Sequence, residues 1–169
     1  MNLNKIKKAV IKKRRLIIIE DGDGAQWVGV PEAVYSLDGM PYMNDGQICR
    51  VLGISSEEAA SFSEINHYSE FGPIAKYNDA DDVPPAVKDM GDAITINDTT
   101  LVAVTDENGR TLFFNPDYIA PVAKADVFRL APDDNLLVYE GLFLTAIICP
   151  LRPGENLTNR MHELYEAMK

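Results

Sequence analysis

The sequence predicts an α+β domain in which antiparallel sheets pack on helices. Apolar residues recur at helical spacing near both ends, and the short apolar segments between them are bounded by turn residues. The dipeptide Asn108-Gly109 adds a strong hairpin signal. The chain has 169 residues, of which 46% are hydrophobic, so it has the usual size of one domain and enough apolar residues for a core. We therefore expect a single domain over residues 1–169.

The first half, residues 1–65, begins with an amphipathic helix. Leu3, Ile6 and Val10 lie on one face of it because they are spaced by three and four residues. Turn residues separate the strands that follow, and Ser55 with Glu58 forms a capping-box pattern. The expected elements are a helix over residues 2–14, strands over 16–20, 25–30 and 33–37, a capped helix ending at 52, and a helix over about 56–65.

Residues 66–90 are expected to form a connecting loop, because Gly-Pro, Pro-Pro and an acidic run interrupt every periodic pattern there. The second half, residues 91–153, is more regular. Asn115-Pro116 supplies a cap and a first-turn proline for a helix that Pro121 limits to about two turns. The expected elements are strands over 93–96, 100–105 and 110–114, that helix to about 124, and a meander over 127–131, 136–140 and 142–149.

An appended helix is expected over residues 154–169. Leu157, Met161, Leu164 and Met168 would share one face of it. Such an apolar face must be buried, either by docking on the parent sheet or by pairing with a second copy of the chain. Docking is the favoured arrangement, and pairing would make the protein a homo-oligomer.

Composition argues against several classes of protein. The longest apolar runs are far shorter than the roughly 20 residues that cross a bilayer, and the N-terminus lacks a secretory cleavage pattern. We therefore expect a cytoplasmic protein with no membrane association. Cys49 and Cys149 lie in apolar segments, where reduced buried thiols are usual.

No set of residues has the spacing of a catalytic or metal centre. Glu64 and His67 have the spacing found in di-iron proteins, yet no second Glu-x-x-His pair accompanies them. Zinc-ligand spacings, nucleotide-binding loops and paired catalytic carboxylates are likewise not recognisable. The sequence thus predicts no catalytic residue, no metal and no cofactor, and a protein that is not an enzyme.

Charge is divided unevenly along the chain. Residues 1–15 hold seven basic and no acidic side chains, whereas the other 154 residues hold 9 basic and 26 acidic ones, a formal charge of -17. At 100° per residue, a basic face of the first helix would gather Lys5, Lys8, Lys12 and Arg15. The charge pattern alone leaves two interpretations open, a phosphate-binding face or a solvated terminal arm.

The segment over residues 112–153, LFFNPDYIAPVAKADVFRLAPDDNLLVYEGLFLTAIICPLRP, resembles the end of a bacterial DNA polymerase sliding-clamp domain. In that family a strand leads into an Asn-x-x-Tyr-Leu motif and a helix, and the segment closes on an apolar strand, a proline and an arginine. The matching positions here are Asn115, Tyr118, Ile119, residues 145–148, Pro150 and Arg152. The resemblance covers about a quarter of the chain. The chain departs from it by opening on a helix rather than a strand.

The resemblance implies a DNA-clamp-like fold and a noncatalytic protein associated with DNA or the replication machinery. Clamp rings have an acidic exterior, and the basic side chains on the helices of their bore contact phosphates without reading bases. The predicted DNA contacts are therefore Lys5, Lys8, Lys12 and Arg15, flanked by Lys7, Lys13 and Arg14.

The expected partners are double-stranded DNA and replication or other proteins, and an association with a mobile element is a further hypothesis. The alternative function is a protein–protein interaction module with a clamp-like fold and no DNA binding. The two hypotheses differ in where they place the basic face. DNA binding predicts it on the concave side of a curved sheet or ring, and the module predicts it at a protein interface or disordered.

Overall fold

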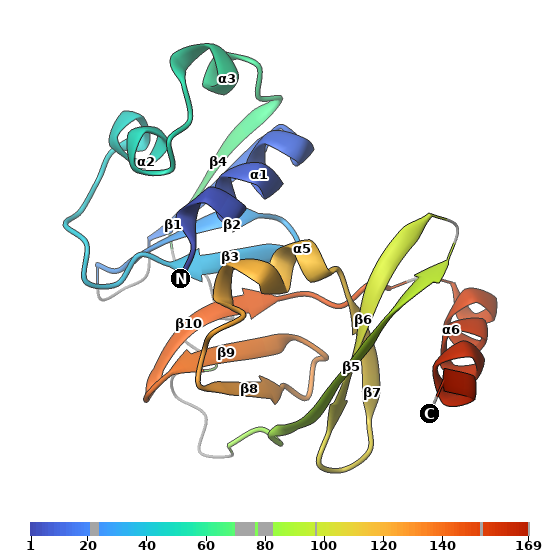
Figure 1. Ribbon diagram of the computed structural model, residues 1–169. Coiled ribbons are helices and arrows are strands. Elements are labelled where there is room, and N and C mark those ends of the chain that lie inside the picture. Colours follow the sequence, from blue (N-terminus) through green and yellow to red (C-terminus); the bar gives the residue numbers. More distant parts are fainter. Residues whose placement is uncertain (21–23, 70–76, 78–82, 97, 153, 169) are drawn as a thin grey trace.

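Two sheets form the framework of the protein in the computed structural model (Figure 1), which describes residues 1–20, 24–69, 77, 83–96, 98–152 and 154–168. In chain order the elements are α1 (Leu3–Lys13), β1 (Arg15–Glu20), β2 (Gln26–Val30), β3 (Ala33–Ser36), α2 (Asp45–Val51), α3 (Ser56–Ala60), β4 (Glu64–Ser69), β5 (Val87–Ile96), β6 (Thr99–Asp106), β7 (Thr111–Phe114), α5 (Pro116–Ile119), the 3-10 helix η1 (Ala120–Val122), β8 (Val127–Leu130), β9 (Leu136–Glu140), β10 (Phe143–Ile148) and α6 (Glu155–Met168). The larger sheet has the order β4-β1-β2-β3-β10-β9-β8, and the smaller one has the order β5-β6-β7. The predicted α+β class is confirmed.

The first helix, α1, forms where the sequence predicts it. The Asn2 side chain caps it by accepting a hydrogen bond of 3.3 Å from the Lys5 backbone N–H. Ile6 and Val10 are fully buried, which confirms the predicted apolar face. Arg14 ends the helix in the left-handed region at φ 54°, and Arg15 begins β1. The prediction that Arg15 lies on the helical face of Lys5 is therefore wrong.

The larger sheet contains two three-strand meanders that meet edge to edge. α1 precedes the meander β1-β2-β3, and α5 with η1 precedes the meander β8-β9-β10. The last strands of the two meanders pair antiparallel, with Tyr35 opposite Ala146 and Ala33 opposite Ile148. Each meander therefore runs from an outer strand to the centre of the sheet, in the order β1-β2-β3 from one side and β8-β9-β10 from the other. The two helices that precede the meanders, α1 and α5, are in contact with each other (Figure 1). Antiparallel pairing of β8 with β9 and of β9 with β10 confirms the predicted C-terminal meander.

The larger sheet is buried on both faces. In β1, Leu16 and Ile18 belong to the main core beneath the helices, whereas Ile17 and Ile19 belong to a second apolar cluster. Alternate side chains of a strand point to opposite faces, so a continuous apolar run is what a strand covered on both sides requires. This arrangement explains why residues 16–19 show no polar alternation.

The middle of the chain differs from the prediction. α3 ends at Ala60 instead of continuing to residue 65, and Glu64–Ser69 forms β4, which pairs parallel with β1. β5 begins at Val87. The loop predicted over residues 66–90 is therefore wrong at both ends, where residues 66–69 belong to β4 and residues 87–90 to β5. The residues of β4 are mostly exposed, and a strand held at a sheet edge by a distant partner carries little local signal. The turn residues 21–23 and the acidic residues 79, 81 and 82 lie outside the described residues.

The C-terminal helix α6 docks on the smaller sheet, as favoured from the sequence (Figure 1). Met161 and Tyr165 are 1% and 4% exposed and pack in one cluster with Phe113 of β7. The predicted stripe is wrong in its second half, because Leu164 and Met168 are 40% and 53% exposed. The side chains that face the sheet are instead those of Leu157, Met161 and Tyr165, which are spaced by four residues. None of the helices in the described part of the chain has the length and apolar character needed to cross a bilayer.

Candidate nucleic-acid interface

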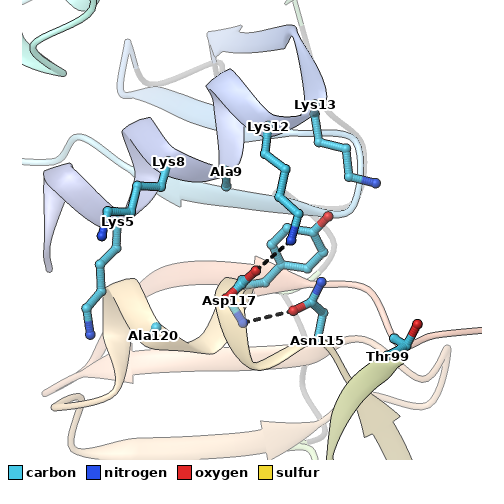
Figure 2. A pocket seen from close by; sticks show the side chains of 10 residues that line it. Lys5, Lys8, Ala9, Lys12, Lys13, Thr99, Asn115, Asp117 and Ala120 are labelled. Carbon is cyan, nitrogen blue, oxygen red and sulfur yellow. Dashed lines mark hydrogen bonds and ion pairs between the residues drawn. The ribbon is translucent and has the colours of Figure 1, made fainter. Parts of the chain in front are cut away.

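A pocket of about 570 Å³ lies between α1 and α5 (Figure 2). Two small side chains, those of Ala9 in α1 and of Ala120 directly after α5, belong to its lining. Lysines of α1 form one wall, and α5 with its cap forms the other. We call this pocket the lysine groove, and its lining residues are Lys5, Lys8, Ala9, Lys12, Lys13, Thr99, Asn115, Asp117, Tyr118 and Ala120.

The lysines gather here because of helix geometry. Lys5, Lys8 and Lys12 are spaced by three and four residues, so they share one face of α1. The opposite side of the helix is anchored in the core by Ile6 and Val10. Burial of that apolar face therefore turns the basic face toward α5, as Figure 2 shows for Lys5 and Lys12.

Two of the four groove lysines are paired with acidic side chains. Lys12 Nζ lies 3.0 Å from Asp117 Oδ2, in a pair whose side chains are 70% and 59% exposed. Lys13 Nζ hydrogen-bonds to the Glu32 carboxylate, and this bond raises the pKa of Lys13 above its ordinary value. Lys5 and Lys8 are exposed and make no side-chain hydrogen bond or ion pair within the residues that the structure describes. These two ammonium groups remain available to an anionic ligand.

The other three predicted DNA contacts hold the α2–β4 region instead of lining the groove. Lys7 hydrogen-bonds to the Gly53 carbonyl and pairs with Glu58 at 3.2 Å. The Arg14 guanidinium donates two hydrogen bonds, of 2.9 and 2.6 Å, to the Ser61 carbonyl. Arg15 lies 3.6 Å from Glu64. The structure therefore separates Lys7, Arg14 and Arg15 from the groove and brings Lys13, predicted as a flanking contact, into it.

Hydrogen bonds and burial hold the α5 wall of the groove in place. The Asn115 side chain caps α5 by accepting a 2.9 Å hydrogen bond from the Asp117 backbone N–H. The Tyr35 hydroxyl donates a 2.7 Å hydrogen bond to the Tyr118 carbonyl, and Tyr118 and Ile119 are themselves buried. Asn115, Tyr118 and Ile119 thus have structural roles here, because they position the wall that faces α1.

A smaller pocket of about 120 Å³ adjoins the groove and shares Lys13, Asn115 and Tyr118 with it. Cys149 lies at this pocket, and burial raises the pKa of its thiol. A thiol with a raised pKa is largely protonated at neutral pH and is a poor nucleophile. This pocket therefore extends the groove without adding a reactive group.

The described residues hold no cluster of three or more potential metal ligands. Glu64 pairs with Arg15, whereas His67 Nε2 lies 3.1 Å from Asp45 Oδ2, so the two residues engage different partners. Another pocket, of about 460 Å³ between α2 and α3, is lined by Asp45 and Arg50 together with small and apolar side chains. It lacks the concentration of one charge that distinguishes the lysine groove.

Sequence reasoning missed the residues that complete the groove from other parts of the chain. The sequence predicts Asn115 at a helix start, but no local pattern indicates that Asp117 contacts α1 or that Thr99 lines the same pocket. Within the described residues, the Asn115 amide nitrogen and the Thr99 hydroxyl make no hydrogen bond of their own, so both can donate to an anion. Comparisons with protein-family models, curated proteins and solved structures found no match to this chain.

Proposed function

We propose that the protein is a noncatalytic DNA-associated protein that contacts the phosphate backbone of double-stranded DNA through the lysine groove. The observation that carries the proposal is that Lys5 and Lys8 have no side-chain partner among the described residues and lie with Lys12 on one face of a helix that is anchored in the core. The remainder of the chain is strongly acidic and would be repelled by a polyanion. Binding is therefore expected at this face.

The spacing of the lysines suits a phosphate backbone. A helix rises about 1.5 Å per residue, so Lys5 and Lys12 are about 10 Å apart along α1. One DNA strand carries a charge about every 3.4 Å of the duplex axis, so the three lysines can reach two or three phosphates. Such contacts hold a duplex without distinguishing its sequence.

The arrangement of the sheet supports a clamp-like form of this function. Two helix-plus-meander units join edge to edge, and α1 and α5 lie side by side. In sliding clamps, helices of this kind carry the basic side chains that meet DNA. We extend the proposal to a role alongside the replication machinery, in which several copies of this chain would be needed to surround a duplex.

A second candidate function is an interaction module that binds an acidic segment of another protein. The observation favouring it is that Lys12 and Lys13 already bind carboxylates, those of Asp117 and Glu32. A segment rich in Asp and Glu would offer the same group to Lys5 and Lys8. In this case the groove would bind acidic peptides and have no affinity for DNA.

The test is fluorescence polarisation of a labelled duplex over a range of salt concentrations. A groove variant carries Lys5→Glu, Lys8→Glu and Lys12→Glu. A control variant carries Lys88→Glu, Lys124→Glu and Arg160→Glu, which change the net charge equally at exposed positions outside the groove. Circular dichroism checks that both variants are folded.

We expect the wild-type protein and the control variant to bind the duplex and the groove variant to lose binding. The logarithm of the wild-type affinity should fall against the logarithm of salt concentration with a slope of about -2 to -3, which corresponds to two or three phosphates. Negligible binding by all three proteins at low salt would reject DNA binding and favour the interaction module.

A further inference from the structure

Asp117 is the one acidic side chain among the described residues that line the lysine groove. Its position is fixed, because its backbone N–H is held by Asn115 and the helix that carries it is held by Tyr35. Its carboxylate lies 3.0 Å from Lys12 Nζ (Figure 2). An anionic group therefore already occupies the place that a ligand phosphate would take at this lysine.

We propose that Asp117 is an internal competitor for phosphate and makes the groove selective for ligands that carry several phosphates in a row. This inference rests on the proposed binding of phosphates in the groove. The shared chemistry is a chain of closely spaced phosphate groups, which a polynucleotide strand or a small polyphosphate can supply. A single phosphate ion is the ligand that the groove rejects.

The selectivity follows from the unequal state of the lysines. A single phosphate at Lys12 must displace a tethered carboxylate or lie beside a like charge, so it gains little. At Lys5 and Lys8 it meets two exposed ammonium groups and cannot reach Lys12 at the same time without meeting Asp117. A phosphate chain can bind these two lysines first and then add Lys12, where the contact with Asp117 is exchanged for a contact with a phosphate that the other two lysines already hold close by.

Replacement of Asp117 by Asn separates this role from folding. Asparagine has the same size as aspartate. The hydrogen bond that Asn115 accepts from the backbone N–H of residue 117 is also unchanged. The pair with Lys12 is exposed, and exposed ion pairs contribute little to stability. The matched control is Glu163→Gln, which removes one negative charge from an exposed position of α6.

The experiment measures duplex affinity, and the direct binding of sodium tripolyphosphate and of orthophosphate by calorimetry, all at equal ionic strength. For the wild-type protein and Glu163→Gln, we expect tripolyphosphate to bind and orthophosphate not to. For Asp117→Asn, we expect duplex and tripolyphosphate to bind about two- to fivefold tighter, which corresponds to the loss of one exposed ion pair, and orthophosphate binding to become measurable.

Each outcome decides between the two proposals. If Asp117→Asn and Glu163→Gln bind the duplex and tripolyphosphate with equal affinity, the role of Asp117 is overturned and DNA binding stands. The same conclusion follows if the wild type binds orthophosphate as tightly as tripolyphosphate. Tripolyphosphate binding that Asp117→Asn strengthens, with no duplex binding, supports the role of Asp117 and rejects the DNA function in favour of a small polyphosphate. Binding of neither ligand by any variant overturns both proposals.

Discussion

The hydroxyl of Tyr35 in β3 donates a 2.7 Å hydrogen bond to the backbone carbonyl of Tyr118 in α5. Tyr35 is fully buried, and this burial raises the pKa of its phenol far above the ordinary value. The phenol therefore remains protonated, and a permanent donor, over the whole physiological pH range. Since Tyr118 lines the lysine groove, this bond links the central strands of the sheet to the candidate site.

Tyr35→Phe should therefore destabilise the protein. The substitution leaves the Tyr118 carbonyl without its buried donor, a loss of about 1–3 kcal/mol. The free energy of unfolding, measured by chemical denaturation, checks this. The control is Tyr42→Phe, which also removes a hydroxyl hydrogen bond, to Glu20 at 2.6 Å, but from a residue that is 65% exposed. Equal effects of the two substitutions would contradict the assignment of Tyr35.

Asp106→Ala should be among the more damaging substitutions of a charged residue. Asp106 is 1% exposed, and its Oδ1 accepts hydrogen bonds of 2.9 Å from the backbone N–H groups of Asn108 and Arg110. Alanine leaves both donors, and the Arg110 guanidinium whose Nε lies 3.4 Å from Asp106 Oδ2, without this partner, at a cost of about 2–4 kcal/mol. Thermal unfolding measures the effect. Glu107→Ala, at the exposed next position, should change stability by less than about 0.5 kcal/mol.

Substitution by alanine should have opposite effects on stability at Gly29 and Gly46. A Cβ at Gly29 in β2 would lie 2.0 Å from the Ala33 carbonyl oxygen, so Gly29→Ala must displace the β2–β3 turn. At Gly46 in α2 the nearest atom would be 3.5 Å away, and alanine there should stabilise the helix by up to about 1 kcal/mol. We expect Gly29→Ala to reduce soluble expression and Gly46→Ala to raise the unfolding temperature. Normal folding of Gly29→Ala would show that the β2–β3 connection is less tight than described.

The cap of α3 predicts a pH dependence. Glu58 accepts a hydrogen bond of 2.7 Å from the Ser55 N–H and pairs with Lys7, and these contacts hold its pKa below the ordinary 4.5. A lowered folded-state pKa contributes stability above the unfolded-state value and loses it as the pH falls through the folded-state value. The wild-type protein should thus have a higher free energy of unfolding than Glu58→Gln at pH 7, and this difference should decline below about pH 4.5. Unfolding free energies between pH 7 and pH 3 check this, and a constant difference would refute it.

The register of α6 gives a further paired test. Met161 is 1% exposed in the cluster that α6 forms with the smaller sheet, whereas Leu164 is 40% exposed. Met161→Ala should cost about 2–5 kcal/mol through lost burial and a cavity, and Leu164→Ala much less. Hydrogen exchange of the α6 amides reports loosening of this helix directly. If Leu164→Ala proved the more damaging, the stripe expected from the sequence would be correct and the docked register wrong.

Local patterns predicted the parts of the fold that depend on neighbouring residues. The buried apolar face of α1, the capping box of Ser55 with Glu58 and the C-terminal meander all appear as expected. These features follow from spacing, caps and turns within a short stretch of chain. β4 was missed because its partner β1 is distant in sequence and its own side chains are mostly exposed.

The candidate site was predicted on one wall only. Helical spacing correctly predicts that Lys5, Lys8 and Lys12 lie together, but it also extends the helical face to Arg15. The helix in fact ends at Arg14 in the left-handed conformation, and the sequence has no glycine there to indicate this end. Arg15 was therefore assigned to the basic face and Lys13 only to its flank. The opposing residue Asp117 depends on how α5 packs against α1, which spacing within either segment does not determine.

The pairing of Tyr35 with Ala146 joins positions more than 100 residues apart, and it has a consequence for the order of folding. Contacts this remote in sequence gain their free energy only after a large loop has closed, so they tend to form slowly. During synthesis on the ribosome, the edge of β3 stays unpaired until the more than 100 residues up to β10 have been made. An uncovered apolar edge in a growing chain invites pairing with other chains, and the lysine groove, whose two walls belong to opposite halves, would mature only at the end of this process.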